Sequence, residues 1–463
     1  MTGKANTDNF QNILLVTIGT LGDVLPFMVI GRHLQQQGLQ VTIATHEHYR
    51  DKAVAYGLAF EPIAETDLQQ FTAHEHAWHP ELGVSVAVDK LLLPMLEPVF
   101  ELTQRLALGR NILTLAHPHA LGARVAQDLH KFPLWTLYPS AWLFQSIFAR
   151  QAYPRVRISS ADAQGRTPVQ YRLLDWLADR VMGDAASKPG ILIGRKKPLW
   201  LRRFARYMFQ HVSDQMLAAA VNHLRQRVGL PSIRGVLTNW CHSPQKAVGL
   251  FPSWYAKPQA DWPQHHLLSG FIEARSSAPL PHDLQAFLTA GDAPVVFTFG
   301  SEKMDNQSGF KAAASACRSL GMRAVFISAD DADVPAEQTG DIFFVRFAPF
   351  DTLFKHASCV VHHGGMGTAA AALRAGIPQL LVPFSYDQPD NAARLRALGV
   401  GVTLAPAMFD REHLVEQIQL LLTSAEIKDN CRRYAESIRN DTALDVIAHE
   451  ISAARFSAPL HKN

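Results

Sequence analysis

The sequence predicts an α/β protein made of two doubly wound, Rossmann-like domains whose ligand-binding ends face one cleft. Two stretches of the 463-residue chain alternate short apolar runs with helical segments, and this alternation is typical of parallel sheets with helices on both faces. A segment dense in Pro and Trp, residues 251–263, lies between them. Because open α/β sheets bind ligands at the carboxyl ends of their strands, the polar turns that follow strands mark the expected site.

Composition sets the class of protein. Hydrophobic residues make up 48% of the chain and charged residues 18%, with a net charge of only +3, so we expect a globular protein with a large core and no nucleic-acid partner. No apolar run reaches the roughly 18 residues of a membrane span. Residues 1–8 are polar, and the four cysteines show neither metal-ligand nor redox spacing. These features favour a cytoplasmic protein with reduced thiols.

The first domain is expected at residues 1–250. It opens with an apolar strand at 13–18, a polar turn at Gly19–Asp23 and a helix that ends near Gly38. Further strands are predicted at residues 41–44, 112–115 and 134–137. Gly19 and Gly22 are interpreted as backbone requirements of the turn, in which Thr20 also lies.

The second domain is expected at residues 271–463, after a semi-rigid connector at 251–270. Its predicted strands are 295–299, 324–328, 342–345, 358–361 and 379–384. The last helix is expected to pack back on the first domain.

A glycine-rich turn follows the predicted strand 358–361. Its residues expected to hold phosphate are His363, Gly364, Gly365, Gly367 and Thr368. A helix is predicted to open at Thr368, with this threonine as its cap. Converging backbone N–H groups and the helix dipole favour an anion, and a plain strand-to-helix turn would not need three glycines and a histidine. His362 points the other way by strand alternation and is expected to be a structural histidine.

Polar side chains follow the next predicted strand. Asp387 and Gln388 are expected to read sugar hydroxyls, and Asn391 lies one helical turn further on. The alternative for these residues is a solvated loop and helix N-cap. A diphosphate site beside a site whose side chains hydrogen-bond to hydroxyl groups indicates a nucleotide-sugar ligand.

These motifs resemble the GT-B glycosyltransferases, the two-domain nucleotide-sugar-dependent family that includes macrolide, sterol and plant natural-product glycosyltransferases. The matching pieces cover nearly the whole chain in the family's order: residues 19–26, 261–271, 299–301, 363–368 and 387–391. Further segments resemble more closely the rhamnosyltransferases that build mono-rhamnolipids, specifically the B chain of the rhamnolipid-forming enzyme system. These segments are residues 78–83, 121–124, 240–245, 250–254 and 259–263.

The resemblance implies an inverting transferase. It assigns Asp23 as the base that deprotonates the acceptor hydroxyl, a task suited to a carboxylate with a raised pKa; the alternative is a helix cap. It implies that Ser301 contacts phosphate, against a simple ST-turn, and that Phe347 stacks on the donor base, against a core position. The family needs no metal and no cofactor, because the nucleotide-sugar is a substrate.

The closer resemblance implies dTDP-L-rhamnose as donor and the hydroxyl of a 3-(3-hydroxyalkanoyloxy)alkanoate as acceptor, giving a mono-rhamnolipid biosurfactant. The chain departs from that pattern at Tyr386 and Pro389, which keeps open a UDP-glucose-dependent glucosyltransferase acting on a hydroxyacyl lipid or sterol-like acceptor. A nucleotide-sugar 2-epimerase and a non-enzymatic lipid-binding protein are more distant alternatives.

A basic helix is predicted within residues 195–209. Leu201, Phe204, Ala205 and Met208 fall at helical spacing, with Arg202, Arg203 and Arg206 on another face. Such a helix can lie on an anionic bilayer, which would place the protein peripherally at the cytoplasmic membrane. The alternative is an ordinary surface helix.

Overall fold

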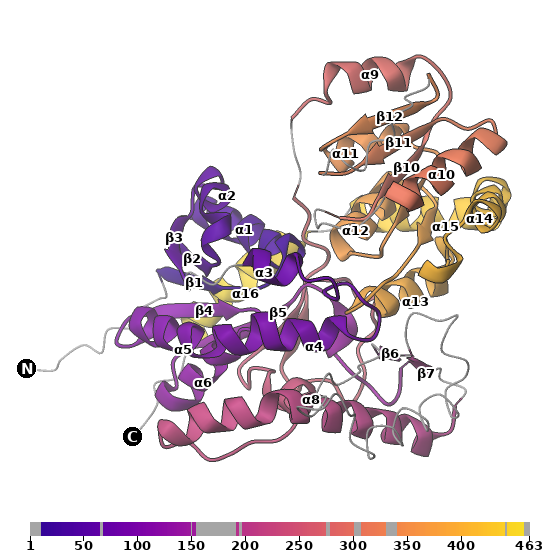
Figure 1. The fold of residues 1–463 in the computed structure, drawn as a ribbon. Helices are drawn as coiled ribbons and strands as arrows, with labels where there is room; N and C mark the ends of the chain where they lie inside the picture. The colour runs from indigo at the N-terminus through magenta and orange to yellow at the C-terminus, as the bar shows by residue number, and fades with distance from the viewer. Residues whose placement is uncertain are drawn as a thin grey trace, which may run out of the picture.

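The computed structural model describes residues 11–64, 68–149, 151–153, 191–193, 197–274, 278–300, 307–329, 340–439 and 442–457. Figure 1 shows two α/β lobes, one coloured indigo to magenta and the other orange to yellow. The predicted fold class, two doubly wound Rossmann-like domains, is confirmed.

In the part of the N-terminal domain that the structure describes, seven parallel strands form a sheet in the order β3-β2-β1-β4-β5-β8-β9. The strands are β1 Asn12–Val16, β2 Gln40–Thr45, β3 Ala59–Pro62, β4 Ile112–Ala116, β5 Leu134–Tyr138, β8 Ala247–Gly249 and β9 His266–Leu268. β9 extends this sheet into the range that composition alone assigned to the connector. A separate antiparallel pair joins β6 Gln151–Tyr153 and β7 Ile191–Ile193.

The structure describes several α-helices in this domain. They are α1 Leu21–Gln36, α2 Arg50–Ala55, α3 Leu68–Thr72, α4 Gly83–Ala87, α5 Leu93–Ala107, α6 Leu121–His130 and α8 Leu199–Arg227. α5 and α6 pack closely because Gly122 carries no side chain: a Cβ there would lie 2.2 Å from the carbonyl oxygen of Leu96.

The C-terminal sheet has the doubly wound order β12-β11-β10-β13-β14-β15. Its described strands are β10 Val295–Thr298, β11 Ala324–Ile327, β12 Ile342–Val345, β13 Cys359–His362, β14 Gln379–Leu381 and β15 Gly401–Thr403. β14 ends three residues before its predicted end. Alternation along β10 sends Val295 and Phe297 into one buried layer and Val296 into the other, which is why the strand reads as a continuous apolar run.

The helices described in the C-terminal domain are α9 His282–Thr289, α10 Gln307–Ser319, α11 Phe350–Leu353, α12 Met366–Ala375, α13 Gln388–Leu398, α14 Arg411–Thr423, α15 Ala425–Arg439 and α16 Ala443–Ser457. The last of them, α16, lies among the elements of the N-terminal domain (Figure 1). It is held there by an ion pair between Glu450 and Lys246 and by Asp445, 3.3 Å from His33. The buried side chains of Ile447 and Ile451 belong to the N-terminal core.

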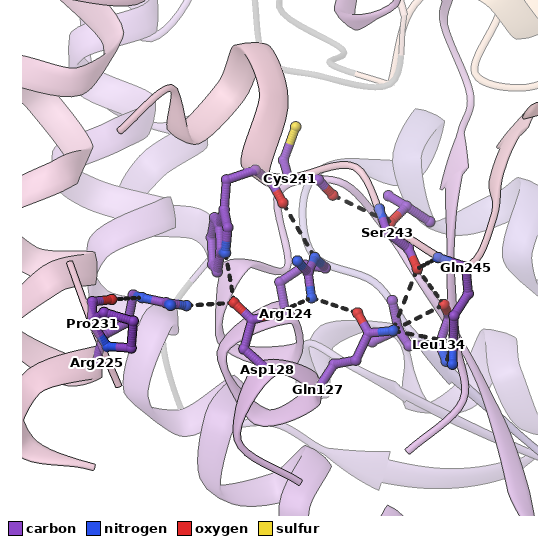
Figure 2. A network of polar contacts seen from close by, with 11 residues as sticks. Arg124, Gln127, Asp128, Leu134, Arg225, Pro231, Cys241, Ser243 and Gln245 are labelled. Carbon is purple, nitrogen blue, oxygen red and sulfur yellow. Dashed lines mark hydrogen bonds and ion pairs between the residues drawn. The ribbon is translucent and has the colours of Figure 1, made fainter. Parts of the chain in front are cut away.

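A buried polar network fastens α8 to the N-terminal domain (Figure 2). Asp128 on α6 accepts from Arg124 at 3.1 Å, Arg225 at 2.5 Å and the Trp240 indole at 2.7 Å. Both arginine side chains are buried. Because each charge is paired and hydrogen-bonded, the network can exist away from water.

The same network continues to β5 (Figure 2). Gln245 accepts from the Leu134 amide at 2.6 Å, and Ser243 donates to the Leu134 carbonyl at 2.6 Å. Two segments that carry the closer resemblance, 121–124 and 240–245, are therefore joined in the framework of the N-terminal domain and hold its strands and helices together.

Candidate active site

The two motifs lie at one domain junction. The Gly19–Asp23 turn follows β1 and enters α1, and the glycine-rich turn follows β13 and enters α12. The charge of Asp23 contributes to raising the pKa of Asp387, and electrostatic influence of this kind requires short separation. Across the junction, Ser140 after β5 donates to Asn391 on α13 at 3.0 Å.

Asp23 occupies the third position of α1, which Thr20 caps. One carboxylate oxygen, Oδ2, accepts from the Thr20 amide at 3.0 Å and from the Thr20 hydroxyl at 3.3 Å. The other oxygen, Oδ1, lies 3.4 Å from Nε2 of His117. The side chain is 34% exposed, so a ligand can reach it. Asp23 thus supports the helix start and also presents a reachable carboxylate.

A neighbouring backbone amide sets the tautomer of His117. The His119 amide donates to Nδ1 of His117 at 3.3 Å, so the neutral ring carries its proton on Nε2 and directs it at Asp23. Burial acts to raise the pKa of Asp23, but the hydrogen bond from His117, the nearby rings of His117 and His119 and the hydrogen bond from the Thr20 amide outweigh burial and lower it. The expectation of a raised pKa was therefore wrong: the Asp23 carboxylate is ionised at neutral pH.

The two glycines of the turn differ. Gly19 has φ +124°, and a Cβ there would lie 2.3 Å from Oδ2 of Asp23. Gly22 has an ordinary φ, and the nearest atom to a Cβ would be 3.8 Å away. The expectation that the turn requires glycine therefore agrees with the structure at Gly19 and was wrong at Gly22, because only at position 19 would a side chain collide with the carboxylate.

His46 is a site residue that the motifs did not reveal. It follows β2, is fully buried, and its Nε2 accepts from the Gly19 amide at 3.1 Å. Burial, opposed by the charge of Asp23, lowers the pKa of His46 to about 4, so the ring is neutral and can accept. Its position in the sequence could have indicated this, because His46 and His117 each follow a strand that pairs with β1.

His363 is enclosed by glycines. A Cβ on Gly365 would lie 2.5 Å from its Nε2, and one on Gly300 (φ +100°) would lie 3.2 Å from its Cε1. Burial lowers the pKa of His363 to about 4. Its Nδ1 is buried and has no partner among the described residues. A buried polar atom without a partner suits a site completed by a ligand.

The start of α12 differs from the prediction. The helix begins at Met366 with Gly365 as its N-cap, so Thr368 lies in the first turn and is not the cap. Gly364 has φ +96°, and Gly367 is exposed with open space around it. The first turn of α12 therefore offers the unpaired N–H groups that an anion can accept from.

His362 is structural, as predicted. It is fully buried, its Nε2 lies 3.0 Å from the side-chain oxygen of Gln379, and its Nδ1 accepts from the Gly364 amide at 3.2 Å. Both ring nitrogens are thus used to fix the turn.

Asp387 is the N-cap residue of α13. Burial, together with the charge of Asp23, raises the pKa of Asp387 to about 6, although a hydrogen bond from Asn391 opposes the shift. Gln388 uses its carbonyl oxygen to accept from the amides of Phe384, at 2.8 Å, and Ser385, at 3.3 Å. The amide NH2 of Gln388 is the end that remains for a hydroxyl.

Asn391 does not fit the sugar-reading role that the sequence suggested. It is fully buried, and its NH2 group donates to the Gly364 carbonyl at 3.0 Å and to Asp387 at 2.7 Å. Its oxygen accepts from Ser140 at 3.0 Å and Tyr255 at 3.1 Å. With its donors and its acceptor engaged inside the protein, Asn391 fixes the junction and positions Asp387.

Phe347 follows β12 and is 70% exposed, so the core alternative was wrong and the ring is free to stack on a flat base. Ser301 lies outside the described residues. Among the described residues, no group of three or more His, Cys, Asp and Glu side chains could hold a metal ion.

Comparisons with known proteins agree with this architecture. The Glycosyltransferase family 28 N-terminal domain matches residues 13–104, and the Erythromycin biosynthesis protein CIII-like, C-terminal domain matches residues 325–454. The O-mycaminosyltylonolide 6-deoxyallosyltransferase of Streptomyces fradiae is 27% identical, covering 97% of this chain and 99% of that protein. The sterol 3-beta-glucosyltransferase UGT80A2 of Arabidopsis thaliana is 24% identical over 93% of this chain, which spans only 63% of that longer protein.

Solved structures show the same fold. The calicheamicin glycosyltransferase CalG4 superposes with a TM-score of 0.65 at 18% identity, covering 97% of this chain and 99% of that one. The spinosyn rhamnosyltransferase SpnG, complexed with thymidine diphosphate, gives a TM-score of 0.60 at 18% identity, covering 95% and 99% of the two chains.

Proposed function

We propose that this chain, whose two domains match glycosyltransferase family models, moves L-rhamnose from dTDP-L-rhamnose to the hydroxyl of a 3-(3-hydroxyalkanoyloxy)alkanoate with inversion, giving a mono-rhamnolipid. The observation that carries the proposal is the arrangement of Asp23. Its ionised carboxylate is held by Thr20 and His117, remains reachable, and lies at the same junction as Asp387.

In the proposed reaction, Asp23 takes the proton of the acceptor hydroxyl as the oxygen forms a bond to the anomeric carbon. The bond from that carbon to the diphosphate oxygen breaks, and the electron pair leaves with the nucleoside diphosphate. The new negative charge is stabilised by the N–H groups at the start of α12 and by His363. Asp387 and Gln388 hold the sugar hydroxyls, and Phe347 stacks on the thymine.

The choice of rhamnose and of a lipid acid rests on the resemblance of short segments, and two of these segments belong to the buried framework network. A second candidate is therefore a UDP-glucose-dependent glucosyltransferase acting on a sterol-like or hydroxyacyl lipid acceptor. The similarity to sterol 3-beta-glucosyltransferases over 93% of the chain favours it. Both candidates use the same base and the same diphosphate site.

Product mass separates the two. Purified protein receives the lipid acid or a sterol, with dTDP-L-rhamnose and UDP-glucose in separate reactions. A deoxyhexose adduct on the lipid acid is the expected result. A hexose adduct would replace the first proposal by the second, and donor turnover without acceptor would indicate an epimerase. Absence of any nucleotide-sugar binding would refute both transferase proposals.

We also propose that α8 meets an anionic membrane surface. Among the described residues no helix has the length and apolar content needed to cross a bilayer. The exposed face of α8 carries Trp200 (67% exposed), Phe204 (40%) and Tyr207 (61%), spaced by four and three residues, with Arg203 among them. Exposed aromatic rings beside a cation suit the interfacial region of a bilayer.

The structure revises which side chains of α8 make that face. Of the residues expected on the apolar face, Leu201 and Ala205 are buried inside the protein and cannot meet a bilayer, whereas Phe204 is exposed. Arg202 donates to the Ile147 carbonyl at 2.6 Å, and Arg206 pairs with Asp261 at 3.1 Å. These two arginines are therefore used inside the protein and leave Arg203 as the membrane-facing arginine of this helix.

Sedimentation with liposomes tests the membrane proposal. Wild type should bind vesicles that contain phosphatidylglycerol at low salt, and the W200A/F204A/Y207A variant should lose most of that binding. A matched control, L108A, removes an apolar side chain that is 52% exposed elsewhere and should bind as wild type. No binding of wild type at low salt would refute the proposal.

A further inference from the structure

Tyr386, in the loop between β14 and α13, reaches the N-terminal domain with its side chain. The hydroxyl of Tyr386 donates to the carbonyl of Ala77 and lies 3.2 Å from the carbonyl of Gly83. A hydroxyl has one proton, so the two carbonyls share it. Both carbonyls belong to residues 77–83, here named the docking turn, which leads into α4.

Packing around this contact is close. The Tyr386 ring meets the edge of Trp78 with centroids 5.6 Å apart and planes at 88°. A Cβ on Gly83 would lie 2.7 Å from the carbonyl oxygen of Ala77, 2.8 Å from the hydroxyl oxygen of Ser385 and 3.3 Å from that of Tyr386. The docking turn can therefore approach the loop only because residue 83 has no side chain.

The backbone of the loop supports the same geometry. Tyr386 has φ +60°, and Lys131 is the other non-glycine residue with a positive φ in the described part of the chain. A bulky residue adopts this left-handed conformation only where its surroundings hold it. Here the side chain of Tyr386 is held by its contact with the docking turn, and the next residue in the chain, Asp387, is the N-cap residue of α13.

Asp387 therefore lies between two ties to the N-terminal domain. Tyr386, the residue before it, is tied to the docking turn, and Asn391, which donates to its carboxylate at 2.7 Å, accepts from Ser140 of the N-terminal domain. The glycine-rich turn is linked to Asn391 through the Gly364 carbonyl, whereas the residue next to Asp387, Tyr386, is linked to the docking turn.

We propose that Tyr386 is a positioning residue: its contact with the docking turn sets the loop that carries Asp387, so that affinity for the sugar of the donor depends on the N-terminal domain. The inference rests on the proposed donor site. It predicts that changing Tyr386 weakens the binding of the sugar part of the donor but leaves the binding of the nucleoside diphosphate part unchanged.

Calorimetry on the full chain tests this by comparing dTDP with dTDP-L-rhamnose and UDP with UDP-glucose. The gain in affinity due to the sugar should fall by about tenfold in Y386F, the loss expected for one hydrogen bond, while affinity for the bare diphosphate stays as in wild type. G83A, altered only in the N-terminal domain, should show the same loss. Y434F is the matched control, because Tyr434 belongs to α15 and its ring packs on Trp254.

Thermal unfolding of each variant separates positioning from plain packing. Unchanged sugar-dependent affinity in both Y386F and G83A would overturn the inference, with or without a loss of stability. A wild type that binds diphosphates but gains nothing from any sugar would overturn the proposed function and the inference with it. A sugar-dependent gain in wild type that survives in both Y386F and G83A overturns the inference and leaves the proposed function standing.

Discussion

Replacing Asp387 by Asn should stabilise the free protein at high pH. Folding raises the pKa of Asp387 from 3.8 to about 6, so the folded state favours the protonated form. The penalty for ionising the group is absent below about pH 4, grows between pH 4 and 6, and is complete above that range. Two pKa units correspond to about 3 kcal/mol. Asn removes the charge and can still accept from Asn391.

Urea unfolding of wild type and D387N at pH 4 and pH 8 measures this effect. We expect nearly equal stability at pH 4 and an advantage of about 2 to 3 kcal/mol for D387N at pH 8, together with weaker binding of the donor sugar. D341N, at an exposed aspartate, is the control and should show no pH-dependent advantage. If D387N gains nothing between pH 4 and pH 8, Asp387 is not a desolvated carboxylate coupled to Asp23.

Three further outcomes follow from the geometry. G19A should lower kcat by about 100-fold or more, because its Cβ would displace the base, whereas G22A should act as wild type in the same assay. H117Q should move the acid limb of the kcat/KM profile to higher pH, because the histidine lowers the pKa of Asp23; an unmoved limb would refute the pairing. D128A should destabilise the protein by about 3 to 5 kcal/mol in urea unfolding, since it leaves two buried arginines without their carboxylate, and a loss under 1 kcal/mol would show that water reaches them.

Much of the fold could be predicted because its signals are local. Strands buried on both faces read as apolar runs, and residues 342–345 were placed with their observed bounds. The short strands β8 and β9 were missed, since three residues beside Pro and Trp carry little pattern. Their place in the sheet comes from pairing: β8 pairs with β5, more than 100 residues earlier in the sequence, and β9 then pairs with β8.

The candidate site divides in the same way, into residues that a local motif predicts and residues that only the folded chain brings together. Asp23 and His363 were found because each belongs to a strand–turn–helix motif. Sequence spacing could not show that His117 reaches Asp23, nor that Asn391 is buried with its amide fully used. Tyr386 was noticed only as a departure from the resembled pattern, and its role depends on a contact with residues about 300 positions earlier.

The most direct test of the account is the transfer rate of D23N in a single turnover, with donor bound in excess. Asn keeps the shape of the side chain and an oxygen for the Thr20 amide, but it cannot take a proton. The account predicts that D23N binds the donor as wild type does and transfers sugar slower by about 10² to 10⁴. Transfer by D23N at the wild-type rate would contradict the assignment of Asp23 as the base.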